Sequence, residues 1–456
     1  MYFIYSLLLG LGFLILLPRF LLDALRHGKY VAGFRERLGS VSPMANDKAD
    51  GRPVVWIHCV SVGETQAARP LVQGLREQYP NHRIAVSTIT LTGQTLAREI
   101  FKHDAAKVFY FPFDWRWVVR RTLKAIKPDT VLVMETEIWP SFLRECKRQQ
   151  IPVAIVNGRL SEQSFRRYRV IKGFMTGVLS SLNLAIMQTD ADAERIRALG
   201  MNPDKTLVSG SLKFDAGNMP TTDLLVAEFR ERFKLTDNAP LILAASTHAP
   251  EERIILDALS QVVSQSDVKP RLLIAPRHPE RFAEVAALIE ADGFSWTRRT
   301  AAADPADSRA EVILLDSIGE LQSIYSLASL VFVGGSIAKT GGHNILEPAA
   351  VGACVITGAH THNFQVIVET FAKADAIIQL LPMSDSEATN ELANTISALL
   401  ADPSRRRELG IRARSLVNEN RGATTRTLQS LGAILAKPAS AAESVGSLRA
   451  NRAPKA

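Results

Sequence analysis

The sequence predicts an α/β protein of two doubly wound domains with parallel sheets, preceded by a membrane-anchoring helix. Short apolar runs alternate with helix-like stretches, as they do where parallel strands are joined by right-handed crossovers. The chain has 456 residues, which is too many for one ordinary core and suits two domains of roughly 200 residues each. The first residues of the chain are strongly apolar, unlike the mixed globular composition that follows them.

The N-terminal segment is apolar and uncharged from Tyr2 to Leu17, apart from the hydroxyl of Ser6. A helix needs about 20 residues to cross a bilayer, so residues 1–24 are predicted to be a membrane anchor or a deep interfacial helix. A buried amphipathic helix is one alternative. A cleaved signal peptide is another, but it normally has positive charges before its apolar core and small residues after it, and both are missing here. Positive charges follow the segment instead, at Arg19, Arg26, Lys29, Arg35 and Arg37. This arrangement predicts that the bulk of the protein is cytoplasmic.

Residues 25–52 are predicted to form a basic neck and a polar linker, and the first α/β domain then spans residues 53–215. Its first helix is expected from about Thr65 to Tyr79. Its seven strands are predicted at Val54–Ile57, Ile84–Ser87, Val108–Phe111, Thr130–Met134, Val153–Val156, Leu184–Met187 and Thr206–Val208.

The second α/β domain is predicted to span residues 216–436. Residues 437–456 are rich in Ala, Ser and Pro, which predicts a disordered tail. The strands of this domain are predicted at Leu241–Ala245, Arg271–Ala275, Val312–Leu315, Leu330–Val333 and Ala353–Thr357.

The net charge indicates which kinds of partner the protein binds, and the cysteines indicate whether disulfides or a zinc site are expected. The net charge of +8 suits a membrane surface or an anionic substrate. Nucleic acid is not predicted as a partner, because the basic residues are scattered and aromatic residues make up only 7% of the chain. Cys59, Cys146 and Cys354 are far apart and form no CxxC pair, which argues against a disulfide framework or a zinc site.

The glycine-rich stretch from Val331 to Gly352 is the strongest candidate for a ligand site. It follows a buried apolar run and becomes helix-like from Asn344. Free N–H groups at such a junction bind anionic ligands at the carboxyl edge of an open α/β sheet. Glu347 lies one helical turn further on and suits the hydroxyls of a ribose. A plain strand–turn–helix junction is the alternative for the glycines alone, since a glycine-rich turn is a weak signal.

Polar residues at the other strand ends divide by charge. The first domain has Glu64, Glu135 and Glu137, whereas the second has a basic group. This division predicts that the second domain holds an anionic donor and that the first supplies proton transfer to an acceptor. A guanidinium can hold a phosphate or carboxylate through two parallel hydrogen bonds. The basic group follows the strand that ends near Ala275 and comprises Arg277, His278 and Arg281.

Glu64 is the candidate general base, because it follows a glycine at a strand-to-helix turn. Its alternative role is to stabilise the first turn of its helix through the helix dipole. The pair Glu135 and Glu137 could suggest a metal, but no His or Asp pattern completes a coordination shell, so neither a metal nor another cofactor is predicted. Lys213 either neutralises a departing phosphate or is an ordinary solvated lysine.

The motifs GGHNILEP, SVGETQAA, METE, GSLKFD and PRHPER together resemble the Kdo transferase family of lipopolysaccharide assembly, whose members are GT-B glycosyltransferases (Kdo is 3-deoxy-D-manno-oct-2-ulosonic acid). The resemblance extends from the N-terminal segment to about residue 430. It implies that Glu64 is the proton acceptor and that Glu135 and Lys213 stabilise the transition state. It also implies that CMP contacts fall at Pro276, Arg277, Ile318, Gly319, Glu320, Asn344, Ile345, Leu346 and Glu347.

The same resemblance implies the reaction. The donor would be CMP-Kdo and the acceptor the disaccharide head of a lipid A precursor, lipid IVA, held in the inner membrane. Transfer would invert the anomeric centre without a metal, and the two domains would face each other across a cleft. Two other readings remain: a GT-B enzyme or epimerase that uses a UDP-sugar, and a membrane-tethered nucleotide-binding scaffold without activity. The joint occurrence of the motifs argues against the first, and the presence of Glu64 against the second.

Overall fold

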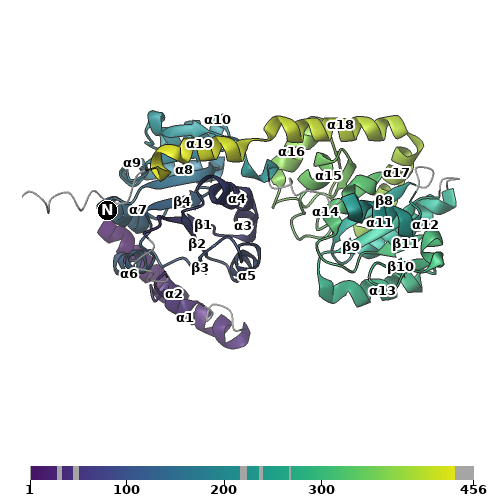
Figure 1. Ribbon diagram of the computed structural model, residues 1–456, viewed down its shortest axis with the longest axis horizontal. Coiled ribbons are helices and arrows are strands. Elements are labelled where there is room, and N and C mark those ends of the chain that lie inside the picture. Colours follow the sequence, from purple (N-terminus) through teal and green to yellow (C-terminus); the bar gives the residue numbers. More distant parts are fainter. Residues whose placement is uncertain are drawn as a thin grey trace, which may run out of the picture. The chain divides into compact units, whose positions relative to one another are not determined.

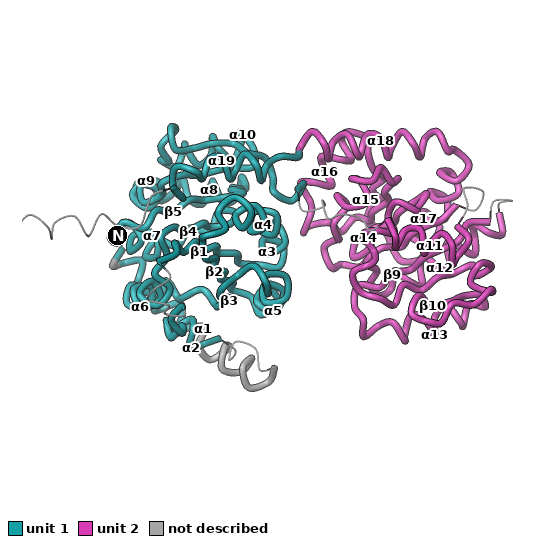
Figure 2. The backbone as a smooth tube through the Cα atoms, viewed as in Figure 1, with its two compact units in different colours: residues 1–216, 421–456 teal, residues 217–420 magenta. Residues whose placement is uncertain are grey.

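The computed structural model describes residues 2–27, 33–44, 51–215, 223–235, 240–265 and 269–436. The chain forms two compact units, which Figure 2 distinguishes by colour. Unit 1 comprises Met1–Ala216 together with Arg421–Ala456, and unit 2 comprises Gly217–Asn420. Each unit contains a seven-stranded sheet in which the paired strands are parallel. Two α/β units with parallel sheets confirm the predicted fold class at this level.

The sheet of unit 1 has the order β3-β2-β1-β4-β5-β6-β7. The strand order therefore reverses between β1 and β4, and open α/β sheets bind ligands outside the carboxyl ends of the strands at such a point. The strands are β1 (Val54–His58), β2 (Arg83–Thr88), β3 (Lys107–Tyr110), β4 (Thr130–Met134), β5 (Val153–Gly158), β6 (Leu184–Met187) and β7 (Thr206–Val208).

Helices cover both faces of this sheet (Figure 1). Trp56 points to one face and Ile57 to the other, and each lies in a separate buried apolar cluster. The helices are α1 (Tyr2–His27), α2 (Phe34–Arg37), α3 (Val62–Ala67), α4 (Arg69–Gln78), α5 (Leu91–Ile100), α6 (Arg116–Ile126), α7 (Pro140–Arg148), α8 (Glu162–Val170), α9 (Lys172–Leu179), α10 (Asp190–Ala198) and α19 (Ala423–Leu435), with 3-10 turns η1 (Pro203–Lys205) and η2 (Leu212–Phe214).

The sheet of unit 2 has the order β10-β11-β9-β8-β12-β13-β14, and its order reverses between β8 and β12. Its strands are β8 (Leu241–Thr247), β9 (Arg271–Pro276), β10 (Trp296–Arg298), β11 (Val312–Leu314), β12 (Leu330–Val333), β13 (Cys354–Thr357) and β14 (Ile378–Gln379). Its helices are α11 (Asp223–Phe233), α12 (Glu251–Gln265), α13 (Phe282–Ala291), α14 (Leu321–Ile324), α15 (Leu346–Ala350), α16 (Gln365–Lys373), α17 (Asp385–Ala401) and α18 (Pro403–Asn420), with 3-10 turns η3 (Pro279–Arg281), η4 (Pro305–Arg309) and η5 (Tyr325–Leu327).

Every strand predicted from the apolar runs is present, with ends shifted by at most two residues. The structure adds two short strands, β10 and β14, that the sequence did not indicate. The single helix predicted from about Thr65 begins earlier, at Val62, and is divided at Ala68 into α3 and α4. Pro70 explains the division, because proline lacks an N–H group and its ring clashes with the preceding helical turn.

The predicted second domain, residues 216–436, is wrong at its C-terminal end. Residues after Asn420 return to unit 1, where the Asp215 carboxylate accepts hydrogen bonds from the amides of Gly422 (2.9 Å) and Thr424 (2.6 Å). The α19 helix then packs against α4, and Gly74 leaves room for the Leu428 side chain, which would lie 2.4 Å from a Cβ atom at that position. The last helix therefore completes the core of the first unit.

The predicted N-terminal anchor, residues 1–24, lies in helix α1. One side of α1 contacts unit 1 through aromatic rings: Tyr2 packs edge-on to Phe174 at 5.3 Å, and Phe13 packs edge-on to Trp115 at 5.2 Å between ring centroids. The opposite side exposes Ile4, Leu7, Leu8, Leu11, Leu14 and Ile15. Within the described ranges, no helix combines the length and the apolar character needed to cross a bilayer. The anchor therefore stays a prediction.

Parts of the predicted ends and linkers lie outside the described residues. They are the predicted tail, residues 437–456, and residues 28–32 and 45–50 of the predicted neck and linker. The three cysteines, Cys59, Cys146 and Cys354, are buried and unpaired.

Candidate active site

The strand-order reversal in unit 1 brings together the acidic residues that the sequence singled out. β1 leads through Val60 into α3, which carries Glu64, and the neighbouring strand β4 ends directly before Glu135. α3 also contacts the η2 turn, which carries Lys213. Residues distant in the sequence thus share the carboxyl edge of the sheet, where ligands bind in this fold.

Glu64 is buried and fixed at the first turn of α3. Its Oε2 accepts a hydrogen bond from the Val60 amide at 2.7 Å, and its Oε1 accepts one from the Ser61 hydroxyl at 3.0 Å. Burial, followed by the negative charge of Glu135, raises the pKa of Glu64 to about 8. A carboxylate is a stronger base when its pKa is raised toward the working pH.

Contacts at the first turn of α3 bear on the helix-stabilising interpretation of Glu64, and its role as a base stays a prediction. Ser61 is the N-cap of α3, because its side chain accepts the Glu64 amide at 3.4 Å. The Glu64 carboxylate accepts the amide of Val60, just before the helix, and so stabilises the entry to α3. These contacts fix its rotamer at the carboxyl edge of the sheet, and they lower the pKa that burial raises. Stabilising the helix and removing a proton are compatible roles for this side chain.

Glu135 and Lys213 form an ion pair beside Glu64. The Lys213 Nζ lies 3.9 Å from Oε1 of Glu135, and both side chains remain partly accessible. Glu135 has a φ of 53°, an uncommon conformation for a residue with a side chain and one that turns the chain sharply at the end of β4. Asn157 holds the lysine segment in place, because its Oδ1 accepts the Leu212 amide at 3.0 Å. The pair places an ammonium beside Glu135, the residue whose negative charge acts on Glu64.

Glu137 lies in the same acidic group, where burial raises its pKa and Glu135 raises it further. Among the described residues, no group of three or more His, Cys, Asp or Glu side chains is arranged to hold a metal ion.

Unit 2 contains the second group of predicted residues, around its own strand-order reversal. After β12 the chain turns through Gly334 and Gly335 and reaches His343 and Asn344. Oδ1 of Asn344 accepts the Leu346 amide at 3.0 Å and its Nδ2 donates to Glu347 at 3.1 Å. Ile345 and Leu346 are buried and contribute packing. Asn344 therefore fixes Glu347 at the start of α15.

Glu251 is a residue that sequence reasoning missed. It opens α12, directly after β8, and is fully buried. Its carboxylate accepts backbone hydrogen bonds at 2.8–3.2 Å from the amides of Gly335, Ser336, Ile337 and Ala338. The glycine-rich loop is thus wrapped around one carboxylate. An acidic residue in the first turn after a central strand is the signal that could have revealed it.

Three histidines gather at the same edge of unit 2. Nε2 of His248 and Nε2 of His343 lie 2.8 Å apart with their rings stacked, and the His278 ring packs edge-on against His248. Burial, followed by the charges of His248 and Arg277, lowers the pKa of His343 to about 3. The pair at 2.8 Å is then a hydrogen bond between neutral rings, one donating and the other accepting. His248 and His343 were also missed from the sequence as site residues.

The predicted basic group of unit 2 is smaller than expected. Arg281 is not available for an anion, because it lies 2.6 Å from Glu252 and 2.7 Å from Glu284. Arg277 follows Pro276, the last residue of β9, is exposed, and makes no ion pair with any residue that the structure describes. Arg277 is therefore the guanidinium best placed to meet a phosphate or carboxylate.

The predicted contacts at Ile318, Gly319 and Glu320 lie in an open turn before α14. The backbone of Gly319 is left-handed, with a φ of 89°, and Ile318 is 79% exposed. Glu320 is held by Arg299, at 2.9 Å between Oε1 and Nη2, so its carboxylate is already neutralised. The turn exposes an apolar side chain and a glycine backbone, and contact with a nucleotide there stays a prediction.

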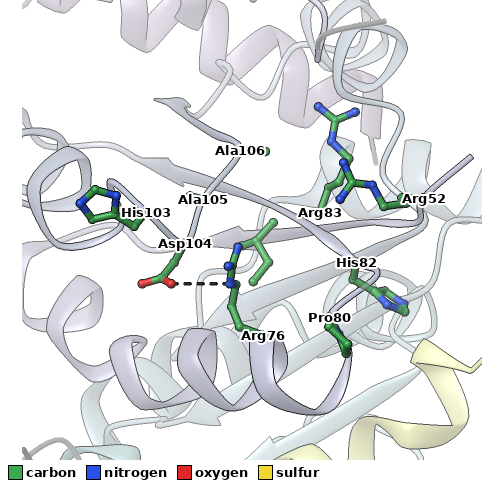
Figure 3. Close-up of a pocket in the computed structure, with 10 residues that line it drawn as sticks. Arg52, Arg76, Pro80, His82, Arg83, His103, Asp104, Ala105 and Ala106 are labelled. Atoms are coloured by element: carbon green, nitrogen blue, oxygen red, sulfur yellow. Dashed lines mark ion pairs between the residues drawn. The ribbon is translucent and has the colours of Figure 1, made fainter. Parts of the chain in front are cut away.

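A basic cavity of about 290 Å³ lies at the opposite edge of the unit 1 sheet (Figure 3). It is lined by Arg52 and Arg83, at the start of β1 and β2, and by Arg76, which pairs with Asp104 at 3.6 Å. It contains none of the predicted site residues, and it opens at the amino ends of the strands, away from Glu64.

Comparison with known proteins identifies relatives that match most of the chain. A family model described as 3-deoxy-D-manno-octulosonic-acid transferase (kdotransferase) matches residues 32–216. The chain is 35% identical over 378 residues to a 3-deoxy-D-manno-octulosonic acid transferase of Haemophilus influenzae, covering 83% of this chain and 86% of the relative. It is 34% identical over 383 residues to the corresponding Bordetella pertussis protein, covering 83% and 86%.

Among solved structures, a UDP-N-acetylglucosamine 2-epimerase aligns with a TM-score of 0.54 at 16% identity, covering 84% of this chain and 95% of the other. The MurG protein of Acinetobacter baumannii aligns with a TM-score of 0.51 at 12% identity, covering 83% and 98%. These likenesses show a shared GT-B-like fold of two α/β domains and nothing about substrate.

Proposed function

Because the chain belongs to the Kdo transferase family and is a glycosyltransferase, we propose that it transfers Kdo from CMP-Kdo to the disaccharide head of a lipid A precursor, lipid IVA. The observation that carries the proposal is the buried Glu64 carboxylate, whose pKa of about 8 accompanies the ion pair of Glu135 and Lys213. A base and a fixed cation at one ligand-binding edge are the groups that glycosyl transfer to a hydroxyl requires.

In the proposed reaction, ionised Glu64 takes the proton of an acceptor hydroxyl. The freed oxygen attacks the anomeric carbon of Kdo, forms the new glycosidic bond, and displaces CMP, which leaves with the electron pair of the broken carbon–oxygen bond. Attack opposite to the leaving group inverts the anomeric centre. The ammonium of Lys213 stabilises the negative charge that develops in the transition state.

The donor groups are proposed to lie in unit 2. CMP-Kdo carries one phosphate and one sugar carboxylate, and the exposed guanidinium of Arg277 offers paired donors to either anion. Glu347, held by Asn344, would accept hydrogen bonds from the ribose hydroxyls. The open turn at Gly319 would approach the cytosine base. These contacts would balance the donor's charge with side chains and amides, and transfer would need no metal.

The acceptor explains why α1 would meet a membrane. Its exposed side is a continuous apolar surface that includes Leu7, Leu11 and Leu14. A helix with an exposed apolar side is stabilised when that side enters the acyl layer, and nearby cations attract anionic lipid headgroups. We place the protein at the inner membrane, with both units on the cytoplasmic face.

The experiment is acceptor-dependent release of CMP from CMP-Kdo, with lipid IVA as acceptor and Glu64→Ala as the comparison. We expect release by the wild type and its loss in the variant, with CMP binding retained. Activity that survives in Glu64→Ala would move the base to Glu135 or Glu137. Turnover of a UDP-sugar in place of CMP-Kdo would overturn the proposed donor and support the alternative GT-B reaction.

A further inference from the structure

An apolar cavity of about 370 Å³ lies between α1 and the rest of unit 1. Ligand pockets for small molecules are typically ~300–1,000 Å³, so this volume is large enough for a ligand. On the α1 side the cavity is lined by Leu9, Gly12 and Phe13, and aromatic rings of Phe111, Trp115 and Trp139 line the side that faces the helix.

The aromatic wall is held rigidly in place. Phe111 stacks on the buried His58 ring at 3.8 Å and contacts Trp139 at 5.7 Å between ring centroids. Asp114 also lines the cavity, but its carboxylate accepts the amides of Ser141 (2.9 Å) and Phe142 (2.7 Å) at the start of α7. Its polar atoms are therefore already satisfied, and the wall suits an apolar ligand.

The cavity is continuous with the exposed apolar side of α1. Leu8 lines the cavity and is also 62% exposed, so it belongs to both surfaces. A Cβ atom built on Gly12 would meet no atom within 4 Å, so the cavity is open beside the helix. An acyl chain could enter from the side of α1 that we propose faces lipid.

The other end of the cavity approaches the candidate base. Ile89 lines the cavity, and its amide donates to the Val60 carbonyl at 3.3 Å. The Val60 amide in turn donates to Glu64. Arg37, which also lines the cavity, donates from its guanidinium to the Ile89 carbonyl. Ile89 in the cavity wall is therefore linked to Glu64 through hydrogen bonds by way of Val60, and the Arg37 cation is bonded to the same Ile89. Glu64 is the carboxylate that would act on the acceptor.

From this geometry we propose that the cavity binds one acyl chain of the glycolipid acceptor, so that α1 forms part of the acceptor site. The proposal rests on the proposed function, since it requires an acylated acceptor whose head group reaches Glu64. Binding the chain beside the base would hold the sugar hydroxyl near the carboxylate and reduce the entropy lost on reaching the transition state. A bilayer phospholipid could also supply a chain, and the test separates the two sources.

The binding test uses tryptophan fluorescence, because Trp115 and Trp139 line the cavity. The probe is a dibrominated stearic acid below its critical micelle concentration, whose bromine atoms quench nearby indole rings. The filling variant is Gly12→Phe and the matched control is Gly10→Phe. Gly10 also lies in α1 with open space at its Cβ, and it does not line the cavity. We expect saturable quenching in the wild type and Gly10→Phe, and at least a ten-fold weaker apparent affinity in Gly12→Phe.

The kinetic test compares lipid IVA with its fully deacylated disaccharide as acceptors. We expect the ratio of kcat/KM for the acylated and deacylated acceptors to fall at least ten-fold in Gly12→Phe and to stay unchanged in Gly10→Phe. If the wild type shows quenching but the kcat/KM ratio is the same in Gly12→Phe, the cavity binds a bilayer lipid and the proposal is overturned. Quenching that Gly12→Phe does not weaken would also overturn it. Failure of Kdo transfer by the wild type would overturn the proposed function instead. The quenching assay does not depend on transfer, so it still reports whether the cavity binds an acyl chain.

Discussion

Ser61 and Glu64 hold each other across the first turn of α3: the Ser61 hydroxyl donates to Oε1 of Glu64 at 3.0 Å and accepts the Glu64 amide at 3.4 Å. The contact orients the carboxylate without neutralising it. Because burial and the charge of Glu135 raise its pKa, the ionised form is costly to hold in the folded protein. The hydrogen bonds from Val60 and Ser61 lower the pKa and so favour the ionised form, which is the form that would serve catalysis, while burial and Glu135 oppose it.

Glu64→Gln should separate these two roles. The amide keeps an oxygen that can accept from the Val60 amide, so α3 should remain capped, but it cannot take a proton. We expect kcat to fall on the order of 10²–10⁴-fold. At about pH 9, where Glu64 is ionised in the wild type, we expect the variant to be more stable by about 1–3 kcal/mol.

The measurements are the rate of CMP release and thermal unfolding followed at neutral and alkaline pH. The control is Glu99→Gln, an exposed glutamate in α5. Equal rates for Glu64→Gln and the wild type would refute the role of Glu64 as base, whatever the unfolding curves show.

The pH dependence of activity and that of stability should run in opposite directions. With a folded pKa of about 8, the basic form of Glu64 accumulates as pH rises, so kcat/KM should increase with pH and level off above about 8. A glutamate in the unfolded chain has an ordinary pKa of 4.5, and therefore the folded state retains this proton between about 4.5 and 8 while the unfolded state has released it. This group makes the free energy of unfolding fall across that window.

The check is a pH–rate profile recorded beside denaturant unfolding at the same pH values, with Glu64→Gln for comparison. The part of the pH dependence of the unfolding free energy that is lost in Glu64→Gln is due to Glu64. A wild-type profile already flat from about pH 5 would show that the carboxylate is ionised at its ordinary pKa.

Lys213→Ala should remove the positive charge that accompanies Glu135. We expect kcat to fall on the order of 10²–10³-fold, because the cation would act on charge that develops in the transition state. Lys213→Arg keeps the charge in a different shape and should recover part of the rate. Steady-state kinetics check this, and Lys205→Ala, which alters an exposed lysine of η1, is the control. A change confined to KM would assign Lys213 to ground-state binding.

Glu251→Gln should loosen the glycine-rich loop of unit 2. One carboxylate oxygen would become an amide nitrogen, which cannot accept from the loop amides that now donate to it. We expect a loss of about 2–4 kcal/mol in the stability of unit 2 and at least a ten-fold weaker affinity for CMP. Calorimetry with CMP measures the second effect, and Glu290→Gln at an exposed position in α13 is the control. Unchanged CMP binding in a destabilised variant would separate the loop from the nucleotide site.

The exposed side of α1 should control membrane binding. Replacing Leu7 and Leu11 by Ser removes two exposed apolar side chains without changing the cavity lining. Burying one leucine side chain contributes ~1.5–3 kcal/mol, so vesicle binding should weaken by at least ten-fold. Sedimentation with anionic phosphatidylglycerol vesicles measures it. Gly10→Phe, which keeps both leucines, is the control. Equal sedimentation of the wild type and the double variant would refute a lipid-facing α1.

The sequence was most informative where strands are buried on both faces. Continuous apolar runs such as Thr130–Met134 and Leu330–Val333 predicted central strands, since parallel strands covered by helices need no polar residues. The two edge strands of unit 2 gave no such signal. β10 and β14 have three and two residues and are only half-buried, so their composition does not differ from that of a loop.

The candidate site shows the same division. Glu135 and Arg277 follow strands directly and Glu64 lies just after the turn from β1 into α3, so position in the chain alone predicted a place at the ligand-binding edge. The role of Glu251 depends on a loop more than 80 residues further along the chain, and that pairing exists only once β8 and β12 are neighbours. Likewise, Arg281 resembles a free cation in sequence until Glu252 and Glu284 are placed beside it.

The return of residues 421–436 to unit 1 inverts the order in which the units can be completed during synthesis. Proteins emerge from the ribosome N-terminus first, and domains generally fold as their residues become available. Unit 2 has its whole sequence once Asn420 has emerged, whereas unit 1 still lacks α19, whose Leu428 and Leu431 fill its core. In the nascent chain, unit 2 would therefore be complete while the apolar surface of unit 1 that binds α19 is still exposed to solvent. A chain that ends early at residue 420 would expose that surface permanently.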